Sequence, residues 1–143
     1  MTIEQLSIFV ENQPGRLAEI TGILAGADID LRAMSIADTA DFGILRIIVS
    51  DTEKALHTLK NAGCAVSVTK VLAVGLTDEP GSLAKVIRVL SDNGVSVEYL
   101  YAFITRKEGS AYVIFRVEDT DKAEAIFAMH GVATAGKEEI YAI

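Results

Sequence analysis

The chain contains an internal repeat, and this repeat limits its possible folds more than any other feature of the sequence. The segment NQPGRLA at residues 12–18 returns 66 residues later as DEPGSLA at residues 78–84. A second segment, DTEKA at 51–55, returns as DTDKA at 119–123. Self-similarity at a nearly constant spacing indicates two copies of one structural unit. We therefore predict two small domains, residues 1–70 and residues 71–143.

Each half shows the same succession of hydrophobic patterns. Apolar residues first alternate along a strand, then follow helical spacing after the Pro-Gly turn, and then alternate again along two further strands. The repeated Asp-Thr segment favours a helix start at Asp51 or Thr52, and a last strand closes each half. The helices are expected to end near Gly26, Gly63, Gly94 and Gly131. The expected strands are 3–10, 29–36, 44–49 and 65–70 in the first half, and 72–76, 95–104, 112–117 and 138–143 in the second.

The resulting order is βαββαβ, twice. Right-handed crossovers place both helices of such a unit on one face of an antiparallel sheet, so we predict an α+β fold made of two ferredoxin-like repeats. No proline, glycine or polar cluster lies between Val66 and Val74. We therefore expect the last strand of the first half to run almost directly into the first strand of the second.

The sequence leaves two points about the sheet faces open. Phe9, Ile48 and Ile114 point away from the predicted helices, which fits either a half-solvated face or a packing surface, and the hydrophobic composition favours packing. In the strand at 95–104, the aromatic row that begins at Tyr99 alternates with a row that contains Leu100, and either row fits the buried side.

Composition and charge limit the possible partners. Half of the 143 residues are hydrophobic and the mean hydropathy is +0.35, which favours buried surface shared between the halves or with a second copy in a homodimer. The formal net charge of −7 disfavours nucleic acid. The apolar stretch at 3–10 is short and contains Glu4, so neither a signal peptide nor a membrane span is expected. The single cysteine, Cys64, excludes an internal disulfide and fits a reducing compartment, from which we predict a cytoplasmic protein.

No set of residues indicates catalysis. The sequence carries no phosphate-binding loop, dinucleotide fingerprint or Ser-His-Asp set. His57 and His130 occupy non-equivalent positions and have no ligand spacing to other histidines, cysteines or acid pairs, so no metal is expected. We predict that the chain is not an enzyme and needs no cofactor.

The repeated Pro-Gly turn is the best candidate for a binding site. Proline suits a helix start, glycine lets a ligand approach the backbone, and the first helical N–H groups attract an anion. A side-chain oxygen of Asn12 or Asp78 stands nearby to accept from an ammonium group. Carboxylate donors next to an ammonium acceptor describe a site for a free α-amino acid. A plain turn is the alternative interpretation, since Asn-x-Pro-Gly is common in turns that bind nothing.

Together with the repeat and the element order, the motif Asn/Asp-x-Pro-Gly-x-Leu-Ala resembles the ACT domain over essentially the whole chain. ACT domains are βαββαβ regulatory modules of amino-acid-metabolising enzymes such as phosphoglycerate dehydrogenase and aspartate kinase. The resemblance implies that two such domains pair side by side and bind an amino acid in the seam. It implies a tandem pair here with no catalytic domain attached.

The resemblance also implies which residues bind the effector, namely the turn after the first strand and the start of the second strand. Where the family commonly has asparagine at the latter position, this sequence has Asp30 and Ser96. If the halves pair around a pseudo-dyad, one site combines Asn12 and Arg16 with Ser96, and the other combines acidic residues, which repel a carboxylate. The Asn12 site is therefore expected to be the primary one. The implied ligand-binding residues are Asn12, Gln13, Gly15, Arg16, Leu17, Asp30, Leu31, Asp78, Glu79, Gly81, Ser82, Leu83, Ser96 and Val97.

These features favour one class of function over three others. The favoured one is a non-catalytic regulatory or sensor protein that binds a free α-amino acid. The alternative is a regulatory subunit that binds and modulates an enzyme of amino-acid metabolism, as in acetohydroxyacid synthase. An enzyme on the same fold is disfavoured, because the sequence shows no convergent set of acid, base and nucleophile. An RNA-binding protein is disfavoured as well, because it would need aromatic residues on the open sheet face within a basic field.

Overall fold

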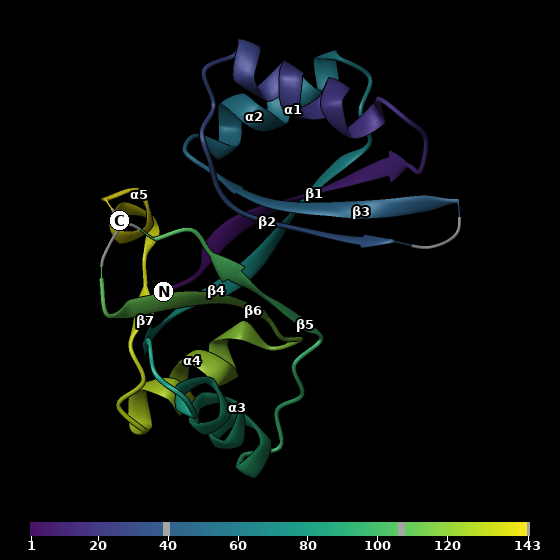
Figure 1. Cartoon of the computed structure of the whole chain (residues 1–143). Helices are drawn as coiled ribbons and strands as arrows, with labels where there is room; N and C mark the ends of the chain where they lie inside the picture. Colours follow the sequence, from purple (N-terminus) through teal and green to yellow (C-terminus); the bar gives the residue numbers. More distant parts are fainter. Residues whose placement is uncertain (39–40, 106–107, 143) are drawn as a thin grey trace. The chain divides into compact units, whose positions relative to one another are not determined.

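The computed structural model of the chain describes residues 1–38, 41–105 and 108–142 (Figure 1). The chain divides into two compact units, which we call the N-unit (Glu4–Thr69) and the C-unit (Met1–Ile3 with Lys70–Ile143). In both, the elements follow the order that the repeat predicts as far as the second helix.

The N-unit is a four-stranded antiparallel sheet with two helices. Its elements are β1 (Ile3–Glu11), α1 (Arg16–Gly26), β2 (Leu31–Asp38), β3 (Phe42–Val49), α2 (Thr52–Asn61) and the first residues of β4 (Val66–Thr77). β3 lies between β1 and β2, in a register that places Leu45 opposite both Ile8 and Ile36. β4 runs along the other side of β1, where the Phe9 N–H donates to the Ala65 carbonyl over 3.0 Å. This strand order is that of a ferredoxin-like unit.

Both helices of the N-unit cover the same face of its sheet (Figure 1). Alternate residues of β1 and β3 supply one side of the core, because successive side chains on a strand point to opposite faces. The helices supply the other side through positions three and four residues apart. The buried core residues are Leu6, Ile8, Val10, Ile20, Leu24, Ile29, Leu45, Ile47, Val49, Ala55 and Leu59.

The C-unit repeats this arrangement with one change at its end. Its elements are the remainder of β4, α3 (Ser82–Asp92), β5 (Tyr99–Phe103), β6 (Ser110–Arg116), α4 (Thr120–Met129), β7 (Thr134–Ala135) and α5 (Lys137–Ala142). β6 lies between β5 and β4, and β7 pairs with the other edge of β4. The core under α3 and α4 consists of Leu72, Val74, Val86, Leu90, Val113, Phe115, Val117, Ala123 and Phe127.

The prediction of a strand at residues 138–143 was wrong. The two-residue strand β7 takes the edge of β4, with Ala135 opposite Ala73, and the chain then forms helix α5. The sequence KEEIYA explains the helix, since its acidic residues fall in the first turn, where the helix dipole favours negative charge. Ile140 anchors α5 because its side chain is fully buried.

The strand predicted at 95–104 is shorter than expected, because β5 begins only at Tyr99. Along it, the aromatic row is the more buried one. Tyr101 and Phe103 are buried, whereas Leu100 and Ile104 are exposed. The face with Phe9, Ile48 and Ile114 is mixed, since both isoleucines are buried and Phe9 is 47% exposed.

The predicted helix starts and the absence of a linker are confirmed. Asp51 and Asp119 are the N-caps of α2 and α4, and their carboxylates accept from the N–H groups of Lys54 and Lys122. β4 continues as one strand from Val66 to Thr77, so the two halves share it without an intervening loop.

The helix ends expected at Gly63 and Gly131 are also confirmed. Both glycines follow the C-caps of α2 and α4 and have φ values of 84° and 70°. Left-handed backbone of this kind ends many helices, and glycine adopts it without a steric penalty.

Candidate functional site

The turn between β1 and α1 is held by backbone hydrogen bonds. The Asn12 N–H donates to the Asp41 carbonyl over 3.0 Å, and the Gln13 N–H donates to the Glu11 carbonyl over 2.9 Å. The Arg16 N–H donates back to the Gln13 carbonyl over 3.3 Å, so this donor is used within the turn. Such a network leaves the turn with one defined shape before any ligand arrives.

The turn between β4 and α3 has the same geometry, residue for residue. The Asp78 N–H donates to Gly109, Glu79 donates to Thr77, and Ser82 donates to Glu79, over 3.2, 2.9 and 3.4 Å respectively. The repeat in sequence is therefore a repeat in structure at the turn.

Glycine is the N-cap of both helices and adopts the left-handed conformation. Gly15 has φ 88° and Gly81 has φ 91°, a region that side chains with a Cβ enter only with strain. Neither helix receives a side-chain cap from the described residues. In α1 the N–H groups of Leu17 and Ala18 therefore point out of the first turn with no carbonyl of their own helix to bind.

Arg16 is the basic residue nearest to this helix start. Its Nη1 lies 2.7 Å from Oε2 of Glu19, one turn along α1. Its Nε is buried and has no hydrogen-bond partner among the described residues. The ion pair with Glu19 reduces the positive charge that Arg16 offers to a ligand, so the N–H groups of α1 are the stronger anion donors here.

Two adjoining cavities extend from this turn within the N-unit. The smaller has a volume of about 120 Å³, and the larger has a volume of about 290 Å³. Leu17 and Ile36 line both, which makes them the wall between the two spaces. The smaller cavity is lined by Val10, Glu11, Asn12, Gln13, Leu17, Ile36 and Gly43. The larger cavity is lined by Leu17, Thr21, Leu31, Met34, Ser35, Ile36, Leu45 and Ile47.

The structure brings together some of the predicted binding residues of the first half. Asn12, Gln13 and Leu17 line the smaller cavity, and Leu31 lies beside Leu17 in the larger one. Asp30 lies at the start of β2, where its N–H donates to Ser50 Oγ over 3.0 Å. Its carboxylate lies 3.3 Å from Nη1 of Arg32, a buried side chain.

The predicted residues of the second half belong to the C-unit. Asp78, Glu79 and Gly81 form its exposed turn, while Ser82 and Leu83 are half-buried in the first turn of α3. Ser96 is exposed ahead of β5, and Val97 packs against the C-unit core. The predicted pairing of Asn12 and Arg16 with Ser96 joins residues of different units and stays a prediction.

Sequence reasoning missed most of the larger cavity. Thr21 follows Leu17 by four residues, so helical spacing places both on one side of α1. Met34 and Ile36 alternate along β2, directly opposite Ile47 and Leu45. The alternation in the sequence groups Met34 and Ile36 on one face of β2, and the register with β3 identifies that face as the one toward the helices.

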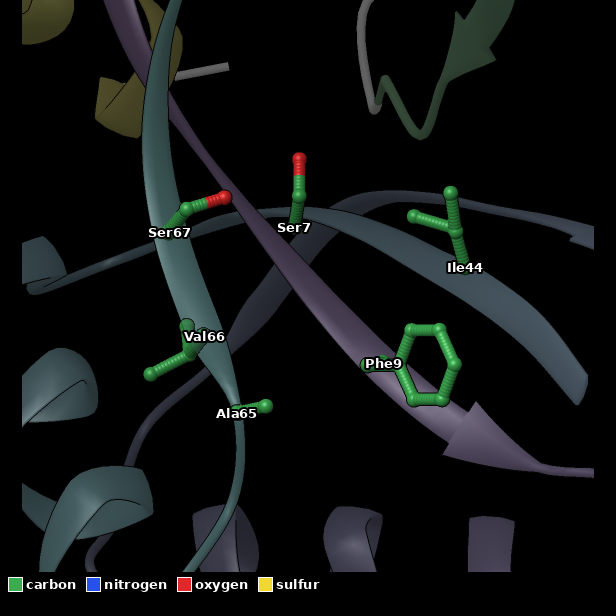
Figure 2. A pocket seen from close by; sticks show the side chains of 6 residues that line it. All are labelled: Ser7, Phe9, Ile44, Ala65, Val66 and Ser67. Carbon is green, nitrogen blue, oxygen red and sulfur yellow. The ribbon is translucent and has the colours of Figure 1, made fainter.

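A further cavity lies on the other face of the N-unit sheet. It has a volume of about 290 Å³ and is lined by side chains of β1, β3 and β4 and by Ala65, as Figure 2 shows. Ser7 accepts a hydrogen bond from the buried Gln5 amide over 3.0 Å. The described residues that line this cavity include neither a charged side chain nor a residue of a helix start, so the cavity offers less to an amino acid than the smaller cavity at the turn. The lining residues are Ser7, Phe9, Ile44, Ala65, Val66 and Ser67.

The described ranges hold neither a metal-binding cluster nor a membrane-spanning helix. Residues 1–38, 41–105 and 108–142 hold no group of three or more His, Cys, Asp and Glu side chains arranged to bind a metal ion. None of the helices in these ranges combines the length and apolar character that crossing a membrane requires.

A known protein family has the features described above. These are the duplicated turn, the shared strand β4 and the pair of helices on one face of each sheet. The model of the ACT domain pair matches residues 1–141. The chain belongs to the ACT domain pair family. ACT domains are regulatory modules, and each ACT copy here contributes one Pro-Gly turn at the start of its first helix.

Solved structures resemble this ACT pair along its length. Protein BT0572 from Bacteroides thetaiotaomicron is 42% identical, covers 100% of this chain and 98% of its own, and superposes with a TM-score of 0.93. The ligand-free regulatory subunit of aspartate kinase from Thermus thermophilus is 18% identical, with coverage of 88% and 90% and a TM-score of 0.62. Aspartokinase III from E. coli, solved with lysine and aspartate, is 16% identical over 90% of this chain and 31% of its own, with a TM-score of 0.52. No curated protein sequence matches the chain.

Proposed function

We propose that this ACT pair is a non-catalytic regulatory protein that binds a free α-amino acid at the turn between β1 and α1. The observation that carries the proposal is the position of the smaller cavity, which begins at the N-terminus of α1. Unpaired helical N–H groups at one end and side-chain oxygens at the other match the two charged groups of an α-amino acid.

The α-carboxylate is expected to accept from the N–H groups of Leu17 and Ala18. The partial positive charge at the helix start stabilises an anion there. The α-ammonium is then expected to donate to the side-chain oxygen of Asn12, a residue that lines the smaller cavity. Gly15 allows the ligand to approach the backbone closely, because it has no Cβ.

The regulatory role is supported by the family and by the fold of the neighbouring structures. The Thermus thermophilus neighbour is a regulatory subunit of aspartate kinase. The E. coli neighbour, solved with lysine and aspartate, is an aspartokinase. We carry over from them the class of ligand, a free amino acid, and leave its identity to experiment.

The experiment is a thermal-unfolding screen of the full chain against the common amino acids, followed by calorimetry on any that stabilise it. A ligand at 100 times its Kd stabilises the folded state by about 2.7 kcal/mol, which shifts Tm by several degrees. A response that Asn12→Ala removes supports the proposal. A protein that no amino acid stabilises contradicts it.

The second candidate is a regulatory subunit that acts by binding an enzyme. The observation in its favour is the exposure of apolar side chains at the larger cavity, where Leu17, Met34 and Ile36 are 42%, 45% and 49% exposed. Exposed apolar groups at one place favour association, with an enzyme or with a second copy as a homodimer. Sedimentation of the chain alone tests the homodimer, and co-purification with an amino-acid kinase from the same cell tests the enzyme.

A further inference from the structure

We infer that the larger cavity of the N-unit receives the side chain of the bound amino acid and selects an unbranched or branched aliphatic or thioether side chain over a charged one. This inference rests on the proposed function, because the turn is assumed to hold the α-carboxylate and α-ammonium groups. It adds the chemical class of the ligand, which neither the family nor the neighbouring structures supply.

The lining of the larger cavity is the first argument. Most of its surface is hydrocarbon or thioether, supplied by Leu17, Leu31, Met34, Ile36, Leu45 and Ile47. The other two lining residues are Thr21 and Ser35, and none of this lining, all within the described chain, carries a charge. A lysine or aspartate side chain placed there would lose part of its hydration without gaining an ion-pair partner, and this loss weakens binding.

The hydroxyl of Thr21 does not make the cavity polar. Its Oγ1 donates toward the carbonyl oxygens of Leu17 and Ala18, over 2.9 and 3.2 Å, as helical threonines often do. Thr21 therefore adds mainly its methyl group to the lining. Ser35 lies between Met34 and Ile36 and opposite Arg46, so alternation turns its hydroxyl to the other face of β2.

The connection between the two cavities is the second argument. Leu17 and Ile36 line both spaces, and the N–H group of Leu17 belongs to the proposed carboxylate site. An amino acid held at the turn therefore has the larger cavity beside its Cα. A volume of about 290 Å³ lies at the small end of the range for ligand pockets, which suits one amino acid better than a larger metabolite.

The second ACT copy differs at the equivalent positions, and the difference provides matched variants. The position of Thr21 is held by Ile87, and that of Ile47 by Phe115, which pairs with Leu100 as Ile47 pairs with Met34. Both replacements bring more atoms into the corresponding space. Thr21→Ile therefore narrows the cavity with a side chain that the second copy itself has at this position.

The experiment measures, by calorimetry, the affinity of the full chain for a homologous series: alanine, 2-aminobutyrate, norvaline and norleucine, with aspartate and lysine as charged probes. Each methylene that enters an apolar cavity should tighten binding roughly fourfold. We expect affinity to rise along the series until the cavity is full, and both charged probes to bind more weakly than norvaline.

Two variants of the cavity and one control variant locate the effect. Met34→Lys places a charge in the cavity lining and should weaken norvaline binding at least tenfold while leaving alanine binding nearly unchanged. Met129→Lys is the matched control, because Met129 is 82% exposed in the other unit and should leave the whole series unchanged. Thr21→Ile should lower the affinity for norleucine more than that for alanine. Circular dichroism and Tm show that each variant remains folded.

The outcomes separate this inference from the proposed function. A flat series, or tighter binding of aspartate or lysine that Met34→Lys does not alter, overturns the inference and leaves amino-acid binding standing. Absence of binding by every probe overturns both. If Met34→Lys loses self-association together with all amino-acid binding, the apolar surface is a protein interface; this result overturns the inference and leaves amino-acid binding by the unchanged chain standing.

Discussion

Asp28 and Gly94 occupy equivalent positions after the first helix of each ACT copy, and both have left-handed backbone, with φ of 59° and 74°. The residue that follows each of them returns a hydrogen bond to its helix: the Ile29 N–H donates to Leu24 over 3.0 Å, and the Val95 N–H donates to Leu90 over 2.9 Å. The geometry of the helix end is therefore the same in both copies, although only one copy has glycine there.

Replacing Asp28 with glycine should stabilise the N-unit by about 0.5–1 kcal/mol, because glycine enters the left-handed region without the steric penalty of a Cβ. Gly94→Ala should destabilise the C-unit by about 1 kcal/mol for the same reason. Urea unfolding followed by circular dichroism measures both. A lower midpoint for Asp28→Gly would contradict this account of the helix end.

Two glycines of the first turn and helix should respond to alanine in opposite directions. A Cβ added at Gly15 or at Gly22 meets no atom within 4 Å, so packing does not distinguish them. Gly15 has φ 88°, and alanine there should destabilise by about 1–2 kcal/mol. Gly22 lies inside α1, where alanine should stabilise by about 0.5–1 kcal/mol. Thermal unfolding of the two variants should show Tm shifts of opposite sign.

Loss of an N-cap should weaken the second helix of either copy equally. Asp51→Ala and Asp119→Ala each remove a carboxylate that accepts from a helical N–H over 3.0 Å, at a cost of about 1 kcal/mol. Asparagine at the same positions keeps the acceptor and should change stability little. Denaturant midpoints for the four variants test this, and equal losses for alanine and asparagine would show that charge rather than capping is responsible.

Truncation of the C-unit core should have the largest effect on stability. Phe127 is fully buried and its ring lies 6.3 Å from that of Phe115, edge to face. Phe127→Ala should destabilise by about 3–5 kcal/mol, because it removes buried surface and leaves a cavity. Phe9→Ala is the comparison, since Phe9 is about half exposed and its loss should cost much less. A similar loss for both would contradict the assignment of the core.

The turn at Asn12 is expected to be the primary binding site of the pair. Asn12→Ala removes an acceptor for the α-ammonium group and should weaken amino-acid binding by about 1.5–3 kcal/mol, the range for a hydrogen bond to a charged group. Asp78→Ala, at the equivalent turn, should change affinity less, because Glu79 stands beside it and repels a carboxylate. Calorimetry with the best ligand decides between the two turns, and a larger loss for Asp78→Ala would reverse the assignment.

The repeat predicted most of the fold because each strand and helix of one half could be recognised a second time at the equivalent position of the other half. Alternation at Leu6, Ile8 and Val10 identified a strand, and Asp51 identified a helix start, since both patterns depend on local chemistry. The strand at 138–143 was predicted wrongly because it was assigned by analogy with the first half. Residues 137–142 form a helix instead, because β7 already pairs with the edge of β4 and the segment has helix-forming residues.

The candidate site was predictable only in part. The Pro-Gly motif located the turn, and with it Asn12, Gln13 and Leu17 of the smaller cavity. The larger cavity depends on which row of β2 faces the helices and on how far α1 covers it, and spacing alone fixes neither. Met34 and Ile36 became visible as lining residues only through their register with β3.

Strand β4 has a consequence for how this duplicated chain tolerates change. One pleated strand pairs with β1 in one unit and with β6 and β7 in the other, so the alternation of its side chains is common to both. Insertion of a single residue near Thr69 would turn every following side chain to the opposite face until a bulge absorbed it. Single-residue insertions and deletions at this junction should therefore be tolerated less well than substitutions at its exposed positions, because they change the facing of both halves of the strand at once.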